Sequence, residues 1–593
     1  MIVRITKAPN GAEYVYTVEG YRDGRGKAMQ RIVAKHGRLD ELLAADPEAL
    51  AKLKQKAAAM TEQHRAGWGV VEYDTRIPSD GVGAKNLGWW LADAVLQRLG
   101  VTGVADEMAA ACGWGLDVAG VLRVLVASQV VWPGSKRAAA FKSGRLYGGI
   151  EMDLGRVYRV LDHVAGLSSR LQEVAAAGVR RPEGALERVD YDVSNYFFHI
   201  DDPDPQPTGI DGARGGATRQ RGHSKENRVE PIIQLGLFTD VEGIPIGFRL
   251  FDGNIPDTST LPMALADFKA GHHPGRVVVV ADKAMNTSPN TGLLASNGDG
   301  WIVSASARHA DAATTAWILD PDGWDDHGAW KTKSKTVTRP VTLPDHTKTT
   351  VAEKLVSSWS AESAFRDRNV RTEMLARAGK LAANPAAFKA SNKKGVKKYI
   401  SATTVDPATG EVLADEELLL TVDQARANGE ALLDGYQLIR TSETALPDDE
   451  IIDRHHQLWR IEAAFRITKT DLKTRPVYVW TPPHIEAHFL ICYLALLVTK
   501  LLEHFTGLPS GQLLDALRRF EAIDCGHGIH RLSRPTSWNT IDEALGVALN
   551  QQWATTPQIH AWTLRLKQAL ADIDYTTTPT THNNHTPLSE NIH

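Results

Sequence analysis

The spacing of hydrophobic positions changes several times along the chain, and these changes divide it into segments. Ala12 to Gly20 alternates β-forming and polar residues ahead of a basic, glycine-containing turn, which predicts a small β-hairpin. Residues 38–65 are rich in Ala, Leu, Lys and Glu and predict a helix. Apolar residues then recur at helical spacing over 86–180. We therefore expect a basic hairpin with a helix at 1–85 and a helical domain at 86–185.

From residue 187 the pattern becomes that of β-strands. Three antiparallel-looking strands are followed by helix, strand, helix and strand, at 188–200, 231–239, 244–252, 258–270, 277–281, 288–296 and 301–304. This order is expected of a ribonuclease H-like sheet with a buried parallel strand. Helical spacing returns at Asp448–Leu472 and His484–His504. The prediction is a ribonuclease H-like core of the α+β class, made of residues 186–305 and 441–505.

The remaining segments make the chain a multidomain protein. Residues 306–440 are mixed and basic, with a helical stretch and short strand candidates, and predict a domain inserted into the core. Residues 506–575 predict a C-terminal helical region. The tail 576–593 repeats Thr, Asn, His and Pro and is expected to be disordered. A length of 593 residues agrees with several domains, since one domain usually takes about 100–200 residues.

Composition narrows the class of protein. A chain with 43% hydrophobic and 23% charged residues is expected to fold rather than to be mainly disordered. The three cysteines, Cys112, Cys492 and Cys525, share no metal-ligand spacing and suggest no disulfide framework, which favours a cytoplasmic location. The N-terminus lacks the pattern of a signal peptide, and the longest apolar run, Phe489 to Val498, is too short to span a bilayer. We expect no membrane role.

Positive charge is concentrated in two segments, although the net charge is −4. Residues 331–400 hold 16 Lys or Arg against 5 Asp or Glu, and residues 1–38 hold 8 against 3. Such segments bind a nucleic-acid backbone through counterion release, largely independent of base sequence. A solvated surface is the alternative. We favour DNA binding for 331–400, with four lysines as candidate contacts: Lys393, Lys394, Lys397 and Lys398. The basic hairpin and helix at 1–85 and the helical region that follows are further candidate DNA-binding regions.

Two aspartates lie at positions in the predicted sheet that suit catalysis. Asp192 is in the middle of an otherwise apolar and aromatic strand, where an unpaired carboxylate costs on the order of several kcal/mol. Asp282 directly follows the apolar run Val277–Ala281, at the carboxyl end of a buried strand, where the sites of such sheets usually lie. A structural role for either residue is an equal alternative from position alone.

A third carboxylate, Glu462, lies in a predicted helix. At about 100° per residue, the stripe that holds Glu462 also holds His455, Arg466 and Lys469, beside an apolar stripe. The alternative is an exposed glutamate paired with Arg466 four residues further on. Phosphodiester cleavage by two magnesium ions about 3.5–4 Å apart requires converging carboxylates. These three acids are the candidates.

Several blocks of residues also resemble a known family. They are Tyr191–Phe198, Gly222–Arg228, Gly243–Gly247, Val278–Lys283, Asp434–Tyr436, and the run from Leu458 through Arg475–Tyr478 to Ile485–Phe489. In this order the blocks resemble transposases of bacterial insertion sequences, of the insertion sequence 1634 type within the larger group related to insertion sequence four. Together with the basic hairpin, the resemblance covers roughly residues 1–505.

The resemblance implies a DDE triad at Asp192, Asp282 and Glu462 that binds two Mg²⁺ ions, with Mn²⁺ able to substitute. Relatives carry a tyrosine, arginine, glutamate, lysine signature, whose last two members fall on Glu462 and Lys469. The first two positions hold His455 and Leu458 instead. These departures place the contacts of the missing tyrosine and arginine in question, and the facing of Arg466 suggests it as a replacement cation.

The activity implied is cut-and-paste DNA transposition: metal-dependent strand cleavage at transposon ends and strand transfer into target DNA. The implied partners are double-stranded DNA, namely terminal inverted repeats and target, and further copies of the chain in a homodimer or larger synaptic complex, associated with the nucleoid when DNA is bound. Lys225 and Arg228 are candidate phosphate contacts in a polar loop. Two alternatives stay open: a transposase-derived DNA-binding protein without catalysis, and a carboxylate-based glycosidase.

Overall fold

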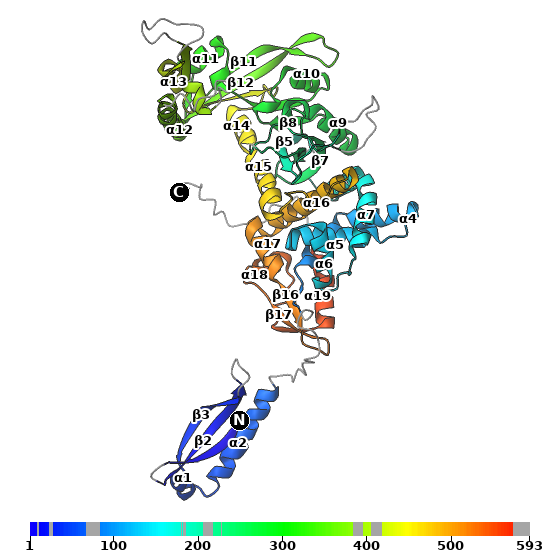
Figure 1. The fold of residues 1–593 in the computed structure, drawn as a ribbon, viewed down its shortest axis with the longest axis vertical. Helices are drawn as coiled ribbons and strands as arrows, with labels where there is room; N and C mark the ends of the chain where they lie inside the picture. Colours follow the sequence, from blue (N-terminus) through cyan, green and yellow to red (C-terminus); the bar gives the residue numbers. More distant parts are fainter. Residues whose placement is uncertain are drawn as a thin grey trace. The chain divides into compact units, whose positions relative to one another are not determined.

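The computed structural model describes the chain outside ten short ranges. These are 9–10, 23–27, 67–82, 180, 182–185, 206–216, 227, 384–394, 405–417 and 573–593. The chain divides into two compact units, one of Met1–Val82 with Asp524–Arg531, and one of Gly83–Ile523 with Leu532–His593. Both are drawn in Figure 1.

The first unit contains the expected hairpin, enlarged by one strand. β2 (Glu13–Arg22) and β3 (Ala28–Arg38) pair antiparallel, and β1 (Ile2–Lys7) pairs with β2. The single helix expected at 38–65 is two helices, α1 (Leu39–Ala45) and α2 (Ala49–Ala66). The break falls at Asp46, which is extended because the residue before a proline disfavours helical geometry.

The second unit is built around a nine-stranded sheet of order β10-β11-β12-β15-β9-β8-β5-β6-β7. Its predicted members occur in the predicted order: β5 (Arg188–Phe197), β6 (Ile232–Thr239), β7 (Pro245–Asp252), α9 (Leu261–His272), β8 (Val278–Ala281), α10 (Ser288–Ser296) and β9 (Gly300–Ala305). β6 pairs antiparallel with β5 and β7, whereas β8 runs parallel to β5 and β9. This pairing matches the ribonuclease H-like core expected from the sequence.

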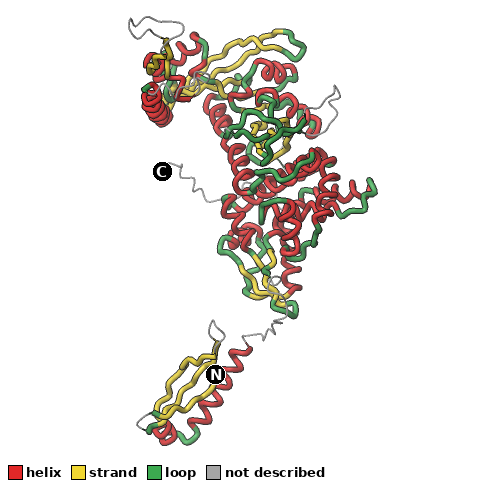
Figure 2. The backbone as a smooth tube through the Cα atoms, in the orientation of Figure 1, coloured by secondary structure: helices red, strands yellow, loops and turns green. Residues whose placement is uncertain are grey.

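The segment predicted as an inserted domain instead continues this sheet. β15 (Tyr436–Thr441) pairs antiparallel with β9, and β12 (Lys348–Ser360) pairs with β15. β11 (Trp330–Thr342) and β12 form a long hairpin, clear in Figure 2, with β10 (Asp325–Asp326) on its outer side. Edge strands expose unpaired backbone groups, and β15 satisfies those of β9. Part of 306–440 therefore belongs to the core sheet.

The rest of this segment is helical or forms a small second sheet. It comprises α11 (Ala312–Leu319), α12 (Ala361–Ala382), η6 (Gly395–Tyr399), β13 (Ile400–Thr404), β14 (Leu418–Val422) and α13 (Gln424–Ala431). β13 and β14 pair antiparallel, and Tyr399 is buried against Ala378 and Ala427. The strand expected near 397–404 thus begins only at Ile400.

The helices expected at 86–185 share one hydrophobic core with later helices and with part of the sheet. They are α3 (Trp89–Arg98), α4 (Val101–Ala111), α5 (Val118–Val131), α6 (Lys136–Lys142), α7 (Leu154–Gly166) and α8 (Ser168–Gly178). At the centre of this core is α16 (Pro482–Thr506). α16 is long and apolar enough to cross a membrane, and α5 with α6 passes the same test as a bent pair; in α16, 89% of the most apolar window is buried inside the protein. Such burial is typical of a core helix.

The C-terminal region combines helices with short strands. α17 (Ser510–Arg519), α18 (Trp538–Leu545) and α19 (Thr556–Asp572) agree with the expected helical region. β16 (Glu521–Asp524), β17 (Ile529–Ser533) and β18 (Trp553–Thr555) were not expected, and β16 pairs with β4 (Lys85–Asn86). The tail 576–593, expected to be disordered, lies outside the described residues.

Candidate active site

Two adjacent parallel strands in the middle of the sheet carry Asp192 and Asp282 at neighbouring positions. Tyr191 on β5 is the register partner of Ala281 on β8, and each aspartate is the next residue on its strand or just beyond it. Asp192 Oδ1 accepts a hydrogen bond from the Val193 amide (2.7 Å), and Asp282 Oδ1 accepts from the Lys283 amide (2.6 Å). The parallel register of β5 with the buried, apolar β8 therefore places the two carboxylates on neighbouring strands.

Glu462 comes from a helix that packs on this sheet. α15 (Trp459–Arg466) follows α14 (Asp448–His456) and continues into a π-helical turn, η7 (Ile467–Asp471). Ile461 and Phe465 are buried while Glu462 is exposed, as the helical stripes predicted. The apolar stripe thus fixes the helix, and the polar stripe is free to face a site.

One pocket of about 630 Å³ collects all three acids. Its walls also carry Lys225, Lys283, Ser304, Ser306, Arg308, Arg366, His455, His456, Leu458 and Trp459. The acids come from β5, the end of β8 and α15. Asp192 and Glu462 are 270 residues apart in sequence. The structure therefore brings together the three carboxylates that the sequence singled out.

The environment of Asp192 disfavours its negative charge. Its side chain is 26% exposed, and burial is the main reason that its pKa rises to about 6. The Lys225 ammonium, 3.8 Å away, lowers this pKa, whereas Asp282 and Glu462 raise it. A divalent cation at this place would offset the mutual repulsion of the carboxylates.

The donor set fits a hard divalent cation, since magnesium prefers carboxylate oxygens. Within the ranges that the structure describes, no three His, Cys, Asp or Glu side chains are grouped closely enough to hold a metal as they stand. Asp282 is held by the Ser304 hydroxyl, which donates to Oδ1 at 2.8 Å.

Of the other predicted contacts, Lys225 reaches the acid pocket and Arg228 does not. Lys225 Nζ donates to the Val193 carbonyl (2.6 Å) and lines the pocket beside Asp192. The Arg228 guanidinium lies over the Phe197 ring, 3.8 Å from its centre, and 3.4 Å from Glu230. Its charge is partly neutralised within its own loop.

The two cations that follow Glu462 also lie outside the residues that line the acid pocket. Lys469 is 3.8 Å from Glu226, and burial together with the Arg475 cation lowers its pKa to about 8. Arg466 is exposed at the end of α15. A role for Arg466 as a replacement cation at the acids remains a prediction.

The two signature positions that differ from relatives both line the pocket. His455 and Leu458 lie on its wall, and burial lowers the pKa of His455 to about 4. The nearby Asp282 carboxylate opposes this effect and raises the pKa, but burial is the larger cause, so His455 is neutral at pH 7. A neutral imidazole supplies hydrogen-bonding groups at this position but no positive charge.

The lysines proposed as a DNA track are only partly described. Lys393 and Lys394 lie outside the described residues, and so does the side chain of Lys397. Lys398 Nζ donates to Glu430 at 2.7 Å, and the Tyr399 hydroxyl donates to the same carboxylate. Charge counting did not anticipate this internal partner of Lys398, because Glu430 is 32 residues away.

Several pocket residues were missed by the sequence reasoning. Ser304 is at the end of β9, the same edge as Asp282, and its position in a predicted strand was a usable signal. Arg308, Arg366 and Trp459 also line the pocket. No local pattern marks the two arginines, because their elements meet only in the folded sheet.

Two known families match parts of this chain. Residues 2–67 match the IS1634 family transposase N-terminal domain, and residues 204–498 match the transposase DDE domain. The second match includes Asp282 and Glu462 and begins after Asp192. No curated protein matches the chain. The two matches are separate, follow the expected order and together cover more than half of the sequence, so the chain belongs to the DDE insertion-sequence transposases of the IS1634 type.

Proposed function

We propose that this transposase catalyses metal-dependent strand cleavage at transposon ends and transfers the freed ends into target DNA, a cut-and-paste reaction. The convergence of Asp192, Asp282 and Glu462 on one pocket is the observation that supports it. Family membership argues against the glycosidase alternative.

The three carboxylates are the residues that would hold two Mg²⁺ ions, with Mn²⁺ as a substitute. When bound, such ions activate the attacking hydroxyl and neutralise charge on the leaving oxygen. Asp192 must be ionised for this, and Lys225 favours its ionised form. The Ser304 hydroxyl and the Lys283 amide orient Asp282.

The cationic walls of the pocket suit a DNA strand. Lys225, Lys283 and Arg366 are exposed around the acids and can contact phosphate oxygens, which positions the strand without reading its bases. Most of the rate acceleration then comes from positioning and charge neutralisation. The further partners we propose are the terminal inverted repeats, target DNA and additional copies of the chain, in a cytoplasmic protein that joins the nucleoid on DNA.

The test compares the native protein with Asp192→Asn, Asp282→Asn and Glu462→Gln on DNA that carries the element's own ends. Each variant should lose at least about 10²-fold in Mg²⁺-dependent cleavage while it still binds DNA. Asp267→Asn is the matched control, because Asp267 is an exposed carboxylate paired with Arg249 outside the pocket. Normal cleavage by the triad variants refutes the assignment. DNA binding without any cleavage by the native protein supports the non-catalytic alternative.

A further inference from the structure

A second hollow of about 440 Å³ adjoins the acid pocket. Lys283, Leu438 and the segment Ser304–Ser306 line both. The second hollow is otherwise lined by Asn286, His309, Ala310, Asp311, Arg339 and Arg440. The second hollow therefore lies directly beside the acid pocket. It combines residues from β9, β11 and β15 with the loop after Asp282.

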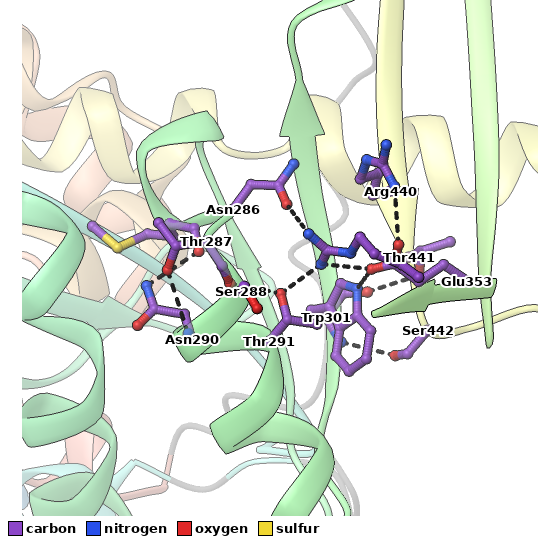
Figure 3. Close-up of polar contacts among 12 residues, drawn as sticks. Asn286, Thr287, Ser288, Asn290, Thr291, Trp301, Glu353, Arg440, Thr441 and Ser442 are labelled. Carbon is purple, nitrogen blue, oxygen red and sulfur yellow. Dashed lines mark hydrogen bonds and ion pairs between the residues drawn. The ribbon is translucent and has the colours of Figure 1, made fainter. Parts of the chain in front are cut away.

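The floor of this hollow carries two arginines that share one buried carboxylate. Glu353 on β12 is fully buried and accepts hydrogen bonds from Arg339 Nη2 (2.8 Å) and Arg440 Nη1 (3.1 Å). The Trp301 indole donates to it as well (3.0 Å), and Figure 3 shows Trp301, Glu353 and Arg440 together. One negative charge thus serves two guanidinium groups that are each only 18% exposed.

Among the residues that line the hollow, positive charge exceeds negative charge. Lys283, Arg339 and Arg440 line it together with the carboxylate of Asp311. Two further carboxylates, Glu353 and Asp282, contact lining residues by hydrogen bonds. Asp311 accepts hydrogen bonds from the Thr314 amide and hydroxyl, both at 2.8 Å, and so caps α11. Arg339 Nε is buried and has no hydrogen-bond partner among the described residues. A guanidinium group that keeps an unpaired N–H donor favours an anion that can accept from it.

The arginines are also held in place. Arg339 donates to Asn286 Oδ1 (3.3 Å) and Thr291 Oγ1 (2.7 Å), as well as to Glu353. Asn286 in turn donates to the Ser304 carbonyl (3.2 Å), and the Ser304 hydroxyl donates to Asp282. An anion bound in the hollow is therefore linked to Asp282 through a short chain of hydrogen bonds.

We propose that this hollow is a second phosphate site, which takes a DNA backbone phosphate next to the one that reacts at the acids. The inference rests on the proposed function. The two hollows share a wall at Ser304–Ser306. A DNA strand that crosses the acid pocket therefore continues into the second hollow. Arginine held by a carboxylate suits a phosphate, since the planar guanidinium binds its oxygens in pairs.

The experiment uses the full chain with Lys283→Gln and Arg440→Gln. Both remove a cation, and glutamine at 440 can still donate to Glu353. The DNA probes carry single neutral methylphosphonates, scanned along the transposon-end strand in one arm and along the target strand in the other. At one position the neutral group should slow the native protein about 10-fold but slow each variant no further. The arm that contains this position shows whether the transposon-end strand or the target strand occupies the second hollow.

The control is Arg276→Gln, at the opposite end of β8, where Arg276 pairs with Glu443. If every methylphosphonate slows variants and native protein by the same factor, or both variants react normally, the phosphate site is refuted. A second readout distinguishes failure of the phosphate site from failure of the proposed function. If the native protein never cleaves, the salt dependence of DNA binding still decides: the slope of log affinity against log salt should fall by about one in each variant. An unchanged slope overturns the site.

Discussion

At the scale of single residues, the acid pocket contains charges that cost free energy until a cation joins them. Burial and the neighbouring Asp282 and Glu462 raise the pKa of Asp192 to about 6, against the opposing effect of Lys225. Metal ions bind the ionised carboxylate only, so protons and metal compete for it. The pH dependence of the reaction should therefore report on Asp192.

Cleavage at low Mg²⁺ should fall as the pH drops through about 6, because Asp192 becomes protonated. Raising the Mg²⁺ concentration should move the midpoint to lower pH. Lys225→Gln should move it to higher pH, because the ammonium favours the ionised form. Rates measured from pH 5 to 8 at several Mg²⁺ concentrations test this, and a midpoint that ignores both metal and Lys225 contradicts it.

Asp190, two residues before Asp192, is fully buried, and neither carboxylate oxygen has a hydrogen-bond partner among the described residues. Burial raises its pKa from 3.8 to about 7. Between these values the folded protein binds more protons than the unfolded chain, so stability falls as the pH rises through this window.

Asp190→Asn should therefore raise the free energy of unfolding relative to the native protein at pH 8 and change it little at pH 4. Urea unfolding at pH 4, 6 and 8 measures the difference. Asp267→Asn, at an exposed carboxylate, is the control and should show no such trend. An Asp190→Asn effect that is equal at every pH would mean that ionisation of Asp190 is not the cause.

A functional residue could be predicted from the sequence when its neighbours along the chain mark it, and not when its role depends on residues far away in the sequence. Asp192 and Asp282 were recognisable because apolar strand neighbours mark them locally. The partnership of Arg339 and Arg440 was not, since it depends on Glu353 and on strand pairing between β12 and β15. Lys398 was assigned to DNA from local charge, and its partner Glu430 became visible only in the fold.

At the scale of elements, the sheet was predictable where strands are apolar on both faces. The apolar run of β8 identified the buried parallel strand, and the spacing of Ile461 and Phe465 identified the face of α15. β11 is basic and alternates exposed and partly buried residues over much of its length, a pattern that resembles a separate surface domain. The membership of β11 and β12 in the sheet depends on β15, which is far away in sequence.

Glu353 is the residue on which attachment of the β11–β12 hairpin should depend most. Glu353→Ala leaves Arg339 and Arg440 without their shared carboxylate in a buried setting, which typically costs about 3–5 kcal/mol. Glu353→Gln keeps an acceptor and should cost less. Urea unfolding measures both. Glu373→Ala, which breaks an exposed pair with Arg377, is the control and should cost under about 1 kcal/mol. Equal costs for Glu353→Ala and Glu373→Ala contradict the prediction.

At the scale of the whole molecule, the second unit has a core that joins regions the sequence suggested as separate domains. One hydrophobic cluster includes α3, α5 and α7, the strand residues Tyr196 and Leu237, and the α15 residues Ile461 and Phe465. α16 lies at its centre, and Leu497 on α16 is fully buried. Elements that share a core in this way are expected to unfold together.

Leu497→Ala should therefore weaken the helical region and the catalytic sheet at once. Truncating a buried leucine costs about 2–5 kcal/mol, and the loss should appear equally in the fluorescence of the buried Trp89, Trp538 and Trp562, in helical circular dichroism and in residual DNA cleavage. Phe141→Ala, at a side chain that is 87% exposed, is the control and should change stability by less than about 0.5 kcal/mol. If Leu497→Ala melts the helices at a lower urea concentration than the one that abolishes cleavage, the regions 86–185 and 186–305 are separate folding units, as the sequence alone suggested. Coincident midpoints mean that the transposase positions its three acids with a core drawn from both.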